Sequence, residues 1–404
     1  MMNSRATRAR VDGPLGPYAD RFRIELGKRG YKPSAAAGHL QLMAHLSRWL
    51  VEHDLAGVDL TPAATEEFLQ SRRAAGYEQW LSTRGLAPLL GYLRDVGFAP
   101  AQVSIAATTP EEVLLDCYRT YLVAERGLAA STVRNYLEVA RLFVSHRQAS
   151  AQPDLAEVTA AQVCEFVVAG CRDRGVGSAT LLVVGMRALL RYLHVAGVTA
   201  SGLADAVPPA ASWPNNSLPQ PIDRRQAARL LRSCDRRTAV GRRDFAVLTM
   251  QLRLGLRVGE VAALDLGDVD WHHGEILVHG KGHRDERLPL PTDVGEALVG
   301  WLQRGRTPCG STRLFTTLIA PRGELTSKAV SALVRRASVR SGVAVTAHRL
   351  RHTAGTELLR SGASLPEVGQ VLRHASLLST ALYAKVDHAA LPIVARPWPA
   401  GAPR

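Results

Sequence analysis

Few cysteines, few aromatic residues and a shortage of acidic residues characterise this chain of 404 residues. The five cysteines are odd in number and show no paired spacing, which argues against a disulfide framework and fits a reducing compartment. Cys164 and Cys171 lack a second pair of metal ligands, so we predict no zinc site. Because aromatic residues make up only 5% of the chain, its cores should consist mainly of Leu, Val and Ala.

Long apolar segments are also missing from the sequence. We find no uncharged apolar run of the length needed to cross a bilayer. Residues 1–13 are polar and basic, unlike a signal peptide. These absences argue against a membrane or exported protein, and we expect a cytoplasmic one.

Basic residues are in clear excess. The 50 Lys and Arg residues against 36 Asp and Glu residues give a net charge of +14 and a pI near 10.1. A surface of this kind favours a polyanion, because each neutralised phosphate releases a counterion. Nucleic acid is therefore the expected partner, and an anionic membrane surface is the alternative that charge alone leaves open.

The N-terminal half contains two helical blocks. Apolar residues recur at helical spacing over residues 18–99 and again over residues 111–197, with Gly and Pro in the gaps. The blocks match at an offset of about a hundred residues: Tyr18 with Tyr118, residues 58–61 with 156–159, and residues 89–93 with 189–193. We interpret them as a duplicated helical domain, with chance similarity between two Ala/Leu-rich stretches as the alternative.

The length suggests two or three domains, and their boundaries follow from composition. An extended linker is predicted where five prolines fall with little apolar periodicity. The predicted parts are a helical N-terminal domain at 1–105, a second helical domain at 106–200, the linker at 201–221, a further domain at 222–390 and an irregular tail at 391–404.

The domain at 222–390 should be mainly α-helical with a small β-hairpin, an α+β arrangement. Residues 223–253 are helical and carry nine arginines, which suits either a solvated face or a phosphate-facing surface. Residues 274–280 and 285–290 predict two strands joined by a polar turn at 281–284. Further helices are predicted at about 293–303, 327–340, 347–361 and 365–372.

This domain also contains the residue types that phosphoryl transfer without a metal requires. Cationic donors must hold the non-bridging oxygens, a nucleophile must attack in line, and an acid must protonate the leaving oxygen. Arginine suits the first task because its planar fork gives two parallel hydrogen bonds to phosphate. Tyrosine can act as the nucleophile, and histidine or lysine can move protons.

Two motifs stand out in this domain: Gly255-Leu256-Arg257 with Glu260, and His348 with Arg351 and His352. Both resemble motifs of the tyrosine recombinases, the phage integrase family. Arg257 lies in the string Gly255-Leu256-Arg257, with Glu260 and residues 264–269 following as the family pattern expects. His348 and Arg351 match the family's most specific box, in which a histidine is followed by two residues, an arginine and a further histidine, here His352.

The resemblance continues towards the C-terminus. His374 lies where the family has a histidine or tryptophan, and Tyr383 follows nine positions later, as the nucleophile should. No other tyrosine follows Tyr192, so Tyr383 has no competitor in this domain. Lys281, in the hairpin turn, falls where the family has its catalytic lysine.

The resemblance implies one role for each residue. Arg257 and Arg351 would clamp the scissile phosphate, His348 would transfer a proton, His374 would hydrogen-bond the phosphate, Lys281 would protonate the leaving 5′ oxygen, and Tyr383 would attack. His352 is expected to give structural support, and Arg349 to contact the DNA backbone or solvent.

The implied function is that of a site-specific DNA recombinase, an integrase of a mobile genetic element. It would cut and rejoin double-stranded DNA through a 3′-phosphotyrosyl intermediate and a Holliday junction, without ATP, metal or another cofactor. It would act as a homo-tetramer on DNA with a dimer at each site, with partner recombinases as an open option, and in the bacterial cytoplasm at the nucleoid rather than at a membrane. Residues 106–200 resemble the family's core-binding domain, and the extra block at 1–105 is expected to bind arm DNA or an extended site.

One departure from the family pattern and three competing functions accompany this prediction. Arg373 stands where the family usually has glycine; we expect the turn to tolerate it, with a phosphate contact as one option. A type IB topoisomerase would use similar groups but reseal the same strand. An architectural DNA-binding protein without catalysis is the second competing function, and an RNA-binding helical protein is the third; the sequence shows no recognisable RNA-binding motif.

Overall fold

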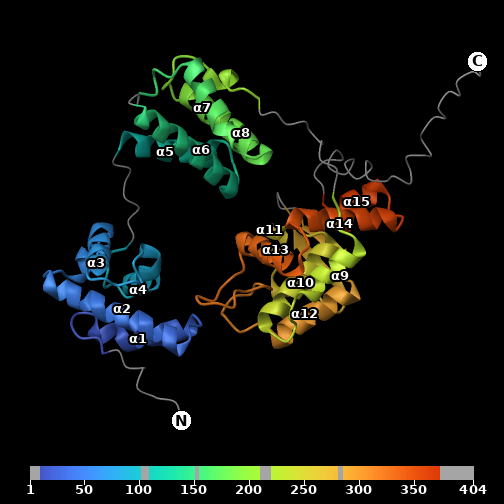
Figure 1. Ribbon diagram of the computed structural model, residues 1–404, viewed down its shortest axis with the longest axis horizontal. Coiled ribbons are helices and arrows are strands. Elements are labelled where there is room, and N and C mark those ends of the chain that lie inside the picture. Colours follow the sequence, from blue (N-terminus) through green and yellow to red (C-terminus); the bar gives the residue numbers. More distant parts are fainter. Residues whose placement is uncertain (1–9, 102–108, 151–153, 210–219, 281–284, 374–404) are drawn as a thin grey trace, which may run out of the picture. The chain divides into compact units, whose positions relative to one another are not determined.

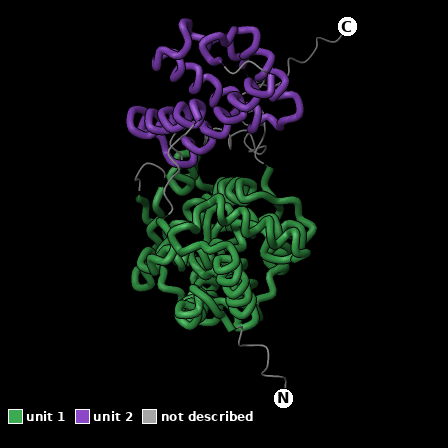
Figure 2. Tube along the Cα trace, turned by 90° about the vertical axis from the view of Figure 1, so that its left-hand side faces the viewer, with its two compact units in different colours: residues 1–101, 217–404 green, residues 102–216 purple. Residues whose placement is uncertain are grey.

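The computed structural model describes residues 10–101, 109–150, 154–209, 220–280 and 285–373 (Figure 1). The chain divides into two compact units, residues 1–101 with 217–404 and residues 102–216 (Figure 2). Separate hydrophobic cores form within residues 11–99, 114–207 and 222–350. The predicted boundary between residues 105 and 106 lies outside the described residues, so it stays a prediction.

The first block is helical throughout. Thr61 begins its third α-helix by accepting a hydrogen bond from the backbone N–H of Ala64 at 3.3 Å, and Pro62 occupies the first turn, where no N–H is needed. Buried Leu40, Met43 and Trp49 supply much of the core. Its elements are η1 (Gly16–Tyr18), α1 (Ala19–Lys28), α2 (Pro33–Glu52), η2 (Gly57–Asp59), α3 (Pro62–Ala74) and α4 (Thr83–Asp95).

The second block is also helical throughout. Thr159 begins its third long helix in the same way, through the N–H of Gln162 at 3.4 Å. Its elements are α5 (Pro110–Thr120), the π-helical turn η3 (Tyr121–Glu125), α6 (Ala130–Ala149), α7 (Ala160–Arg172), α8 (Val176–Val195) and η4 (Leu203–Ala206).

Matching geometry supports the interpretation of a duplication. The helices α2 and α6 have 20 residues each, and α3 and α7 have 13 each. After α4 and α8 the chain turns through Gly97 (φ +73°) and Gly197 (φ +72°), a conformation that glycine adopts without steric cost. An aromatic contact closes each block: Tyr118 packs on Tyr192 with ring centroids 5.0 Å apart, and Phe22 packs on Tyr92 at 4.9 Å, while the Tyr92 hydroxyl donates to the carbonyl of Tyr18 at 3.1 Å.

The start of the predicted linker differs from expectation. Leu203, Ala204 and Val207 are buried in the core of residues 114–207, and η4 packs against α7 and α8. Their apolar side chains, which precede the prolines, explain the difference. Residues 210–219 of the linker lie outside the described residues.

Helix α8 is apolar and long enough, by length and composition alone, to cross a membrane. Its side chains Leu182, Met186, Leu189 and Leu193 are almost fully buried in the core of its own block. Core helices of folded domains are also apolar, so the burial of α8 within its own block explains its apolar composition.

The third block holds the predicted site. It combines helices with a three-stranded antiparallel sheet in the order β1-β2-β3, in which Ile276 pairs with Val269 on one side and Leu288 on the other. Its elements are α9 (Arg224–Arg232), α10 (Ala239–Leu254), α11 (Val258–Ala263), η5 (Leu266–Asp268), β1 (Val269–Asp270), β2 (Glu275–His279), β3 (Asp285–Pro289), α12 (Thr292–Arg304), α13 (Ser327–Ser341), α14 (Ala347–Arg360) and α15 (Leu365–Val371).

The predicted fold class is confirmed. The hairpin and the four following helices appear within two residues of their expected bounds. Two details differ: β1 adds a third strand, and the helical run at 223–253 is two helices. The break falls at Ser233–Thr238, because Thr238 caps a new helix through the N–H of Gly241 at 3.0 Å.

Candidate active site

Gly255 sets the geometry at the start of the site. It ends α10 in the left-handed conformation (φ +59°), and a Cβ there would lie 2.4 Å from Cδ2 of Leu372 and 3.8 Å from Cγ of Arg351. Both the backbone conformation and the close approach require glycine. The motif around Arg257 therefore carries a packing constraint that brings α10 against the segment after α15.

Arg257 is the N-cap residue of α11 and keeps a partly exposed side chain, 41% accessible. Its backbone N–H and its Nη1 donate to the two carboxylate oxygens of Glu260 at 2.8 and 2.6 Å. Glu260 itself is buried. One carboxylate thus fixes the backbone and the guanidinium of Arg257 together, while part of the guanidinium faces outward.

Arg351 is the fifth residue of α14 and is only 4% exposed. Its Nη1 donates to the carbonyl of Gly255 at 2.7 Å, and its Nη2 donates to the carbonyl of Leu372. These contacts join three segments that are far apart in the sequence. Arg351 therefore lies next to the Arg257 motif, as predicted for a second cation at one site.

His348 precedes Arg351 by one helical turn and lies close to both arginines. Partial burial, and then the charges of Arg351 and Arg257, lower its pKa below the ordinary value. Its ring meets that of His352 edge-on, with centroids 4.2 Å apart. Burial and the neighbouring His348 and Arg351 lower the pKa of His352 to about 4, so this ring is neutral near pH 7.

The other three predicted residues, Lys281, His374 and Tyr383, lie outside the described residues. The strand end before Lys281 is described, and His279 there bridges two carboxylates. Its Nδ1 lies 2.9 Å from Asp285 and its Nε2 lies 3.1 Å from Asp268. These hydrogen bonds raise the pKa of His279 and tie the ends of β2, β3 and η5 together.

Arg373 occupies the turn, as expected, but its side chain has a role that the sequence did not indicate. It adopts the left-handed conformation (φ +53°) that a glycine would take, yet its side chain is 5% exposed and its Nη2 donates to Glu260 at 2.8 Å. The guanidinium therefore belongs to a buried ion pair, whereas a phosphate contact was one option from the sequence. The sequence signal that could have revealed this ion pair was Glu260. A carboxylate in the interior needs full pairing, and the partly exposed Arg257 alone would leave it incompletely paired.

Arg349 makes hydrogen bonds within the chain. Its Nε donates to the carbonyl of Gln220 at 2.7 Å, and its Nη1 donates to the carbonyl of Ala344. It therefore holds the segment that leads into α9 against the start of α14. Within the described residues its contacts are structural.

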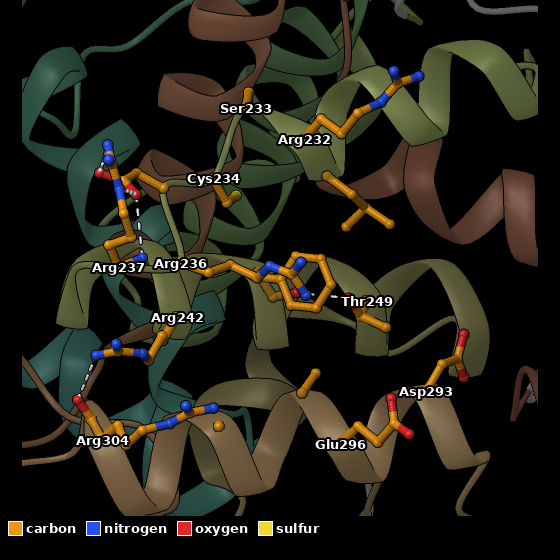
Figure 3. Close-up of a pocket in the computed structure, with 15 residues that line it drawn as sticks. Arg232, Ser233, Cys234, Arg236, Arg237, Arg242, Thr249, Asp293, Glu296 and Arg304 are labelled. Atoms are coloured by element: carbon orange, nitrogen blue, oxygen red, sulfur yellow. Dashed lines mark hydrogen bonds and ion pairs between the residues drawn. The ribbon is translucent and has the colours of Figure 1, made fainter.

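The arginines of residues 223–253 contact several different partners. Arg243 pairs with buried Asp244, Arg253 with Asp293 and Arg224 with Glu357. Others line a groove of about 1010 Å³, into which Asp293 and Glu296 project from α12 (Figure 3). None of the described candidate residues lines this groove, so it is not the predicted site.

The third block thus combines a mainly helical fold around a small antiparallel sheet with two arginines and a histidine that lie close together. Its topology is also found in solved recombinase structures. XerH recombinase bound to palindromic difH substrate in a post-cleavage complex gives a TM-score of 0.54 at 18% identity, over 81% of this chain and 93% of that one. A lambda integrase tetramer bound to a Holliday junction gives 0.54 at 17% identity, over 76% and 87%.

Sequence comparison defines the family. The model of the phage integrase family matches residues 220–390. The putative integrase/recombinase y4rA of Sinorhizobium fredii is 35% identical over 96% of this chain and 95% of its own length. Tyrosine recombinase XerD of Mycobacterium tuberculosis is 31% identical over 72% of this chain and 97% of its own length. The chain belongs to the phage integrase family and is a tyrosine-type site-specific DNA recombinase.

Proposed function

We propose that Tyr383 attacks the scissile phosphate of duplex DNA and forms a 3′-phosphotyrosyl bond with release of a 5′ hydroxyl. A 5′ hydroxyl from a partner duplex then attacks this bond and frees the tyrosine, so phosphodiester bonds are conserved without ATP, metal or another cofactor. Arg257 and Arg351 hold the non-bridging oxygens, and His374 adds a hydrogen bond to the phosphate. His348 transfers a proton at the nucleophile, and Lys281 protonates the leaving 5′ oxygen.

The observation that carries this proposal is the convergence of Arg257, His348 and Arg351. They come from the starts of two helices, and the contact from Arg351 to the carbonyl of Leu372 ties them to the segment that leads to His374. Two guanidinium groups beside a histidine whose pKa is lowered suit a site that binds an anion and moves a proton.

Four protomers, two at each DNA site, would exchange strands pairwise through a Holliday junction. Dimers and a tetramer on DNA occur among the solved structures with this fold, which supports such an assembly. A DNA substrate implies that the enzyme works in the bacterial cytoplasm, at the nucleoid. Reconstitution with the purified protein alone tests whether the assembly needs a second recombinase.

Covalent trapping tests the chemistry. The protein is mixed with duplex DNA from the flanks of its own gene, nicked so that religation is prevented, and the reaction is stopped with detergent. Wild type should give a DNA-shifted protein band and Tyr383→Phe should give none. Tyr77→Phe, at a tyrosine that is 43% exposed in the first block, is the matched control and should behave like wild type.

Two further results would favour a different class of protein. DNA binding without a covalent band in wild type would favour an architectural protein or a missing partner recombinase. Relaxation of supercoils by wild type, without recombinant product, would favour a topoisomerase.

We further propose that the first block binds DNA as a second copy of the core-binding block. The matching helix lengths and turns of the two blocks support this, and XerD is matched over 97% of its length by 72% of this chain. Deletion of residues 1–105 removes one complete core and leaves the others whole. The protected DNA footprint should then shrink, and an unchanged footprint would contradict the proposal.

A further inference from the structure

The buried guanidinium of Arg373 lies at the centre of a small charge cluster. Glu260 accepts hydrogen bonds from Arg373 Nη2 at 2.8 Å and from Arg257 Nη1 at 2.6 Å. Arg257 Nη2 in turn donates to the backbone carbonyl of Arg373 at 3.1 Å. Arg373 thus contacts the same carboxylate as Arg257 and supplies a second acceptor to Arg257.

The balance of charge in this cluster depends on Arg373. Two guanidinium groups and one carboxylate leave a net charge of +1, with Arg257 as the partly exposed member and Arg373 as the buried one. Without Arg373, Glu260 would neutralise Arg257, and the carboxylate would compete with a phosphate for the same donors. Arg373 therefore changes how strongly Arg257 can act on an anion.

We propose that Arg373 is a positioning residue, which holds Glu260 so that the guanidinium of Arg257 stays oriented and positively charged towards the scissile phosphate. The inference rests on the proposed role of Arg257 as a phosphate clamp. The left-handed backbone at Arg373 serves the same purpose, because it directs the carbonyl towards Arg257 while Nη1 of Arg373 donates to the carbonyl of Val371 at 2.7 Å.

The variants Arg373→Gly and Arg373→Lys separate the effect of the side-chain charge at position 373 from the effect of its backbone conformation. Glycine adopts φ +53° readily, so Arg373→Gly should keep the turn and lose only the cation. Lysine keeps a cation near Glu260 but lacks the planar guanidinium, which can donate two parallel hydrogen bonds. Arg360→Ala, at an exposed arginine in the last turn of α14, is the matched control for the loss of one positive charge.

Single-turnover cleavage of the nicked duplex at saturating DNA is the measurement. Arg373→Gly should lower the cleavage rate by roughly 10- to 100-fold, as expected when a reacting group is misplaced. DNA affinity should fall much less. Arg373→Lys should recover part of the rate, and Arg360→Ala should match wild type.

The pH profile provides a readout that a merely structural role would not change. Burial raises the pKa of Glu260, but the charge and hydrogen bonds of Arg373 and Arg257 outweigh it and hold the pKa below its ordinary value. Arg351 and His348, on α14, are the other charged or titratable groups placed near Arg257. Loss of Arg373 should move the acid limb of the cleavage profile to higher pH.

Cleavage by Arg373→Gly at the wild-type rate, or an equal loss in Arg360→Ala, would overturn the inference. An Arg257→Ala variant that cleaves normally would instead overturn the proposed function. The two failures are therefore distinguishable in one set of assays.

Discussion

The two arginines of the site are held in different ways. Arg257 is 41% exposed and is held by the Glu260 carboxylate and by one backbone carbonyl, that of Arg373, whereas Arg351 is 4% exposed and donates to two backbone carbonyls. A carboxylate can be neutralised by protonation or mutation, but a backbone carbonyl cannot. Arg351 should therefore depend on the fold around it, and Arg257 on the charges around it.

The largest effect should come from Glu260→Gln, which removes the charge that holds Arg257. The change leaves the buried guanidinium of Arg373 without its carboxylate, and uncompensated buried charge typically costs about 3–5 kcal/mol. Urea denaturation should show this loss. Glu357→Gln, which disrupts the exposed pair with Arg224, should cost less than about 1 kcal/mol. Equal losses in the free energy of unfolding of the two variants would show that the Glu260 cluster is no stronger than a surface ion pair.

A smaller loss should follow from Gly255→Ala, which disturbs the carbonyl that holds Arg351. Alanine at φ +59° is strained, and its Cβ would overlap Cδ2 of Leu372, so we expect a loss of about 2–3 kcal/mol in the free energy of unfolding. Gly97→Ala is the matched control, since Gly97 has φ +73° and nothing within 4 Å of a Cβ. It should lose only about 1 kcal/mol. If both variants lose the same amount, the contact with Leu372 is irrelevant.

The smallest effect concerns pH and the histidine beside Arg351. The pKa of His352 falls from 6.5 to about 4 on folding, so the unfolded chain binds more protons between these values. Stability should be complete above pH 6.5 and should decline as pH falls towards 4, by roughly 2 kcal/mol after allowance for partial exposure. His352→Asn should flatten this part of the stability curve, and His272→Asn, at an exposed histidine, should leave it unchanged. An unchanged slope in His352→Asn would assign the acid sensitivity to other groups.

The sequence predicted the local structure of the third block well. Apolar periodicity and polar turns are short-range signals, and they located the hairpin and four helices. The motifs also identified Arg257, His348 and Arg351, which the structure brings together. The catalytic roles of these three residues, and of Lys281, His374 and Tyr383, stay predictions.

The errors share a physical cause, which is that a sequence does not state the partner of a charged or apolar side chain. Arg373 and Glu260 are 113 residues apart and yet form a buried ion pair. Likewise, three arginines of residues 223–253 meet Glu357, Asp293 and Asp244, whereas four others line the groove of Figure 3. Strand β1 was missed because it has only two residues.

The measurement that tests the central claim most directly is mapping of the trapped covalent adduct. Trypsin cuts after Arg373 and Lys385, which yields a peptide of residues 374–385 in which Tyr383 is the only tyrosine. Mass spectrometry should find the DNA remnant on this peptide, attached through a 3′ phosphate to Tyr383. A remnant on a peptide that contains any other tyrosine, or on a residue of another type, would contradict the account.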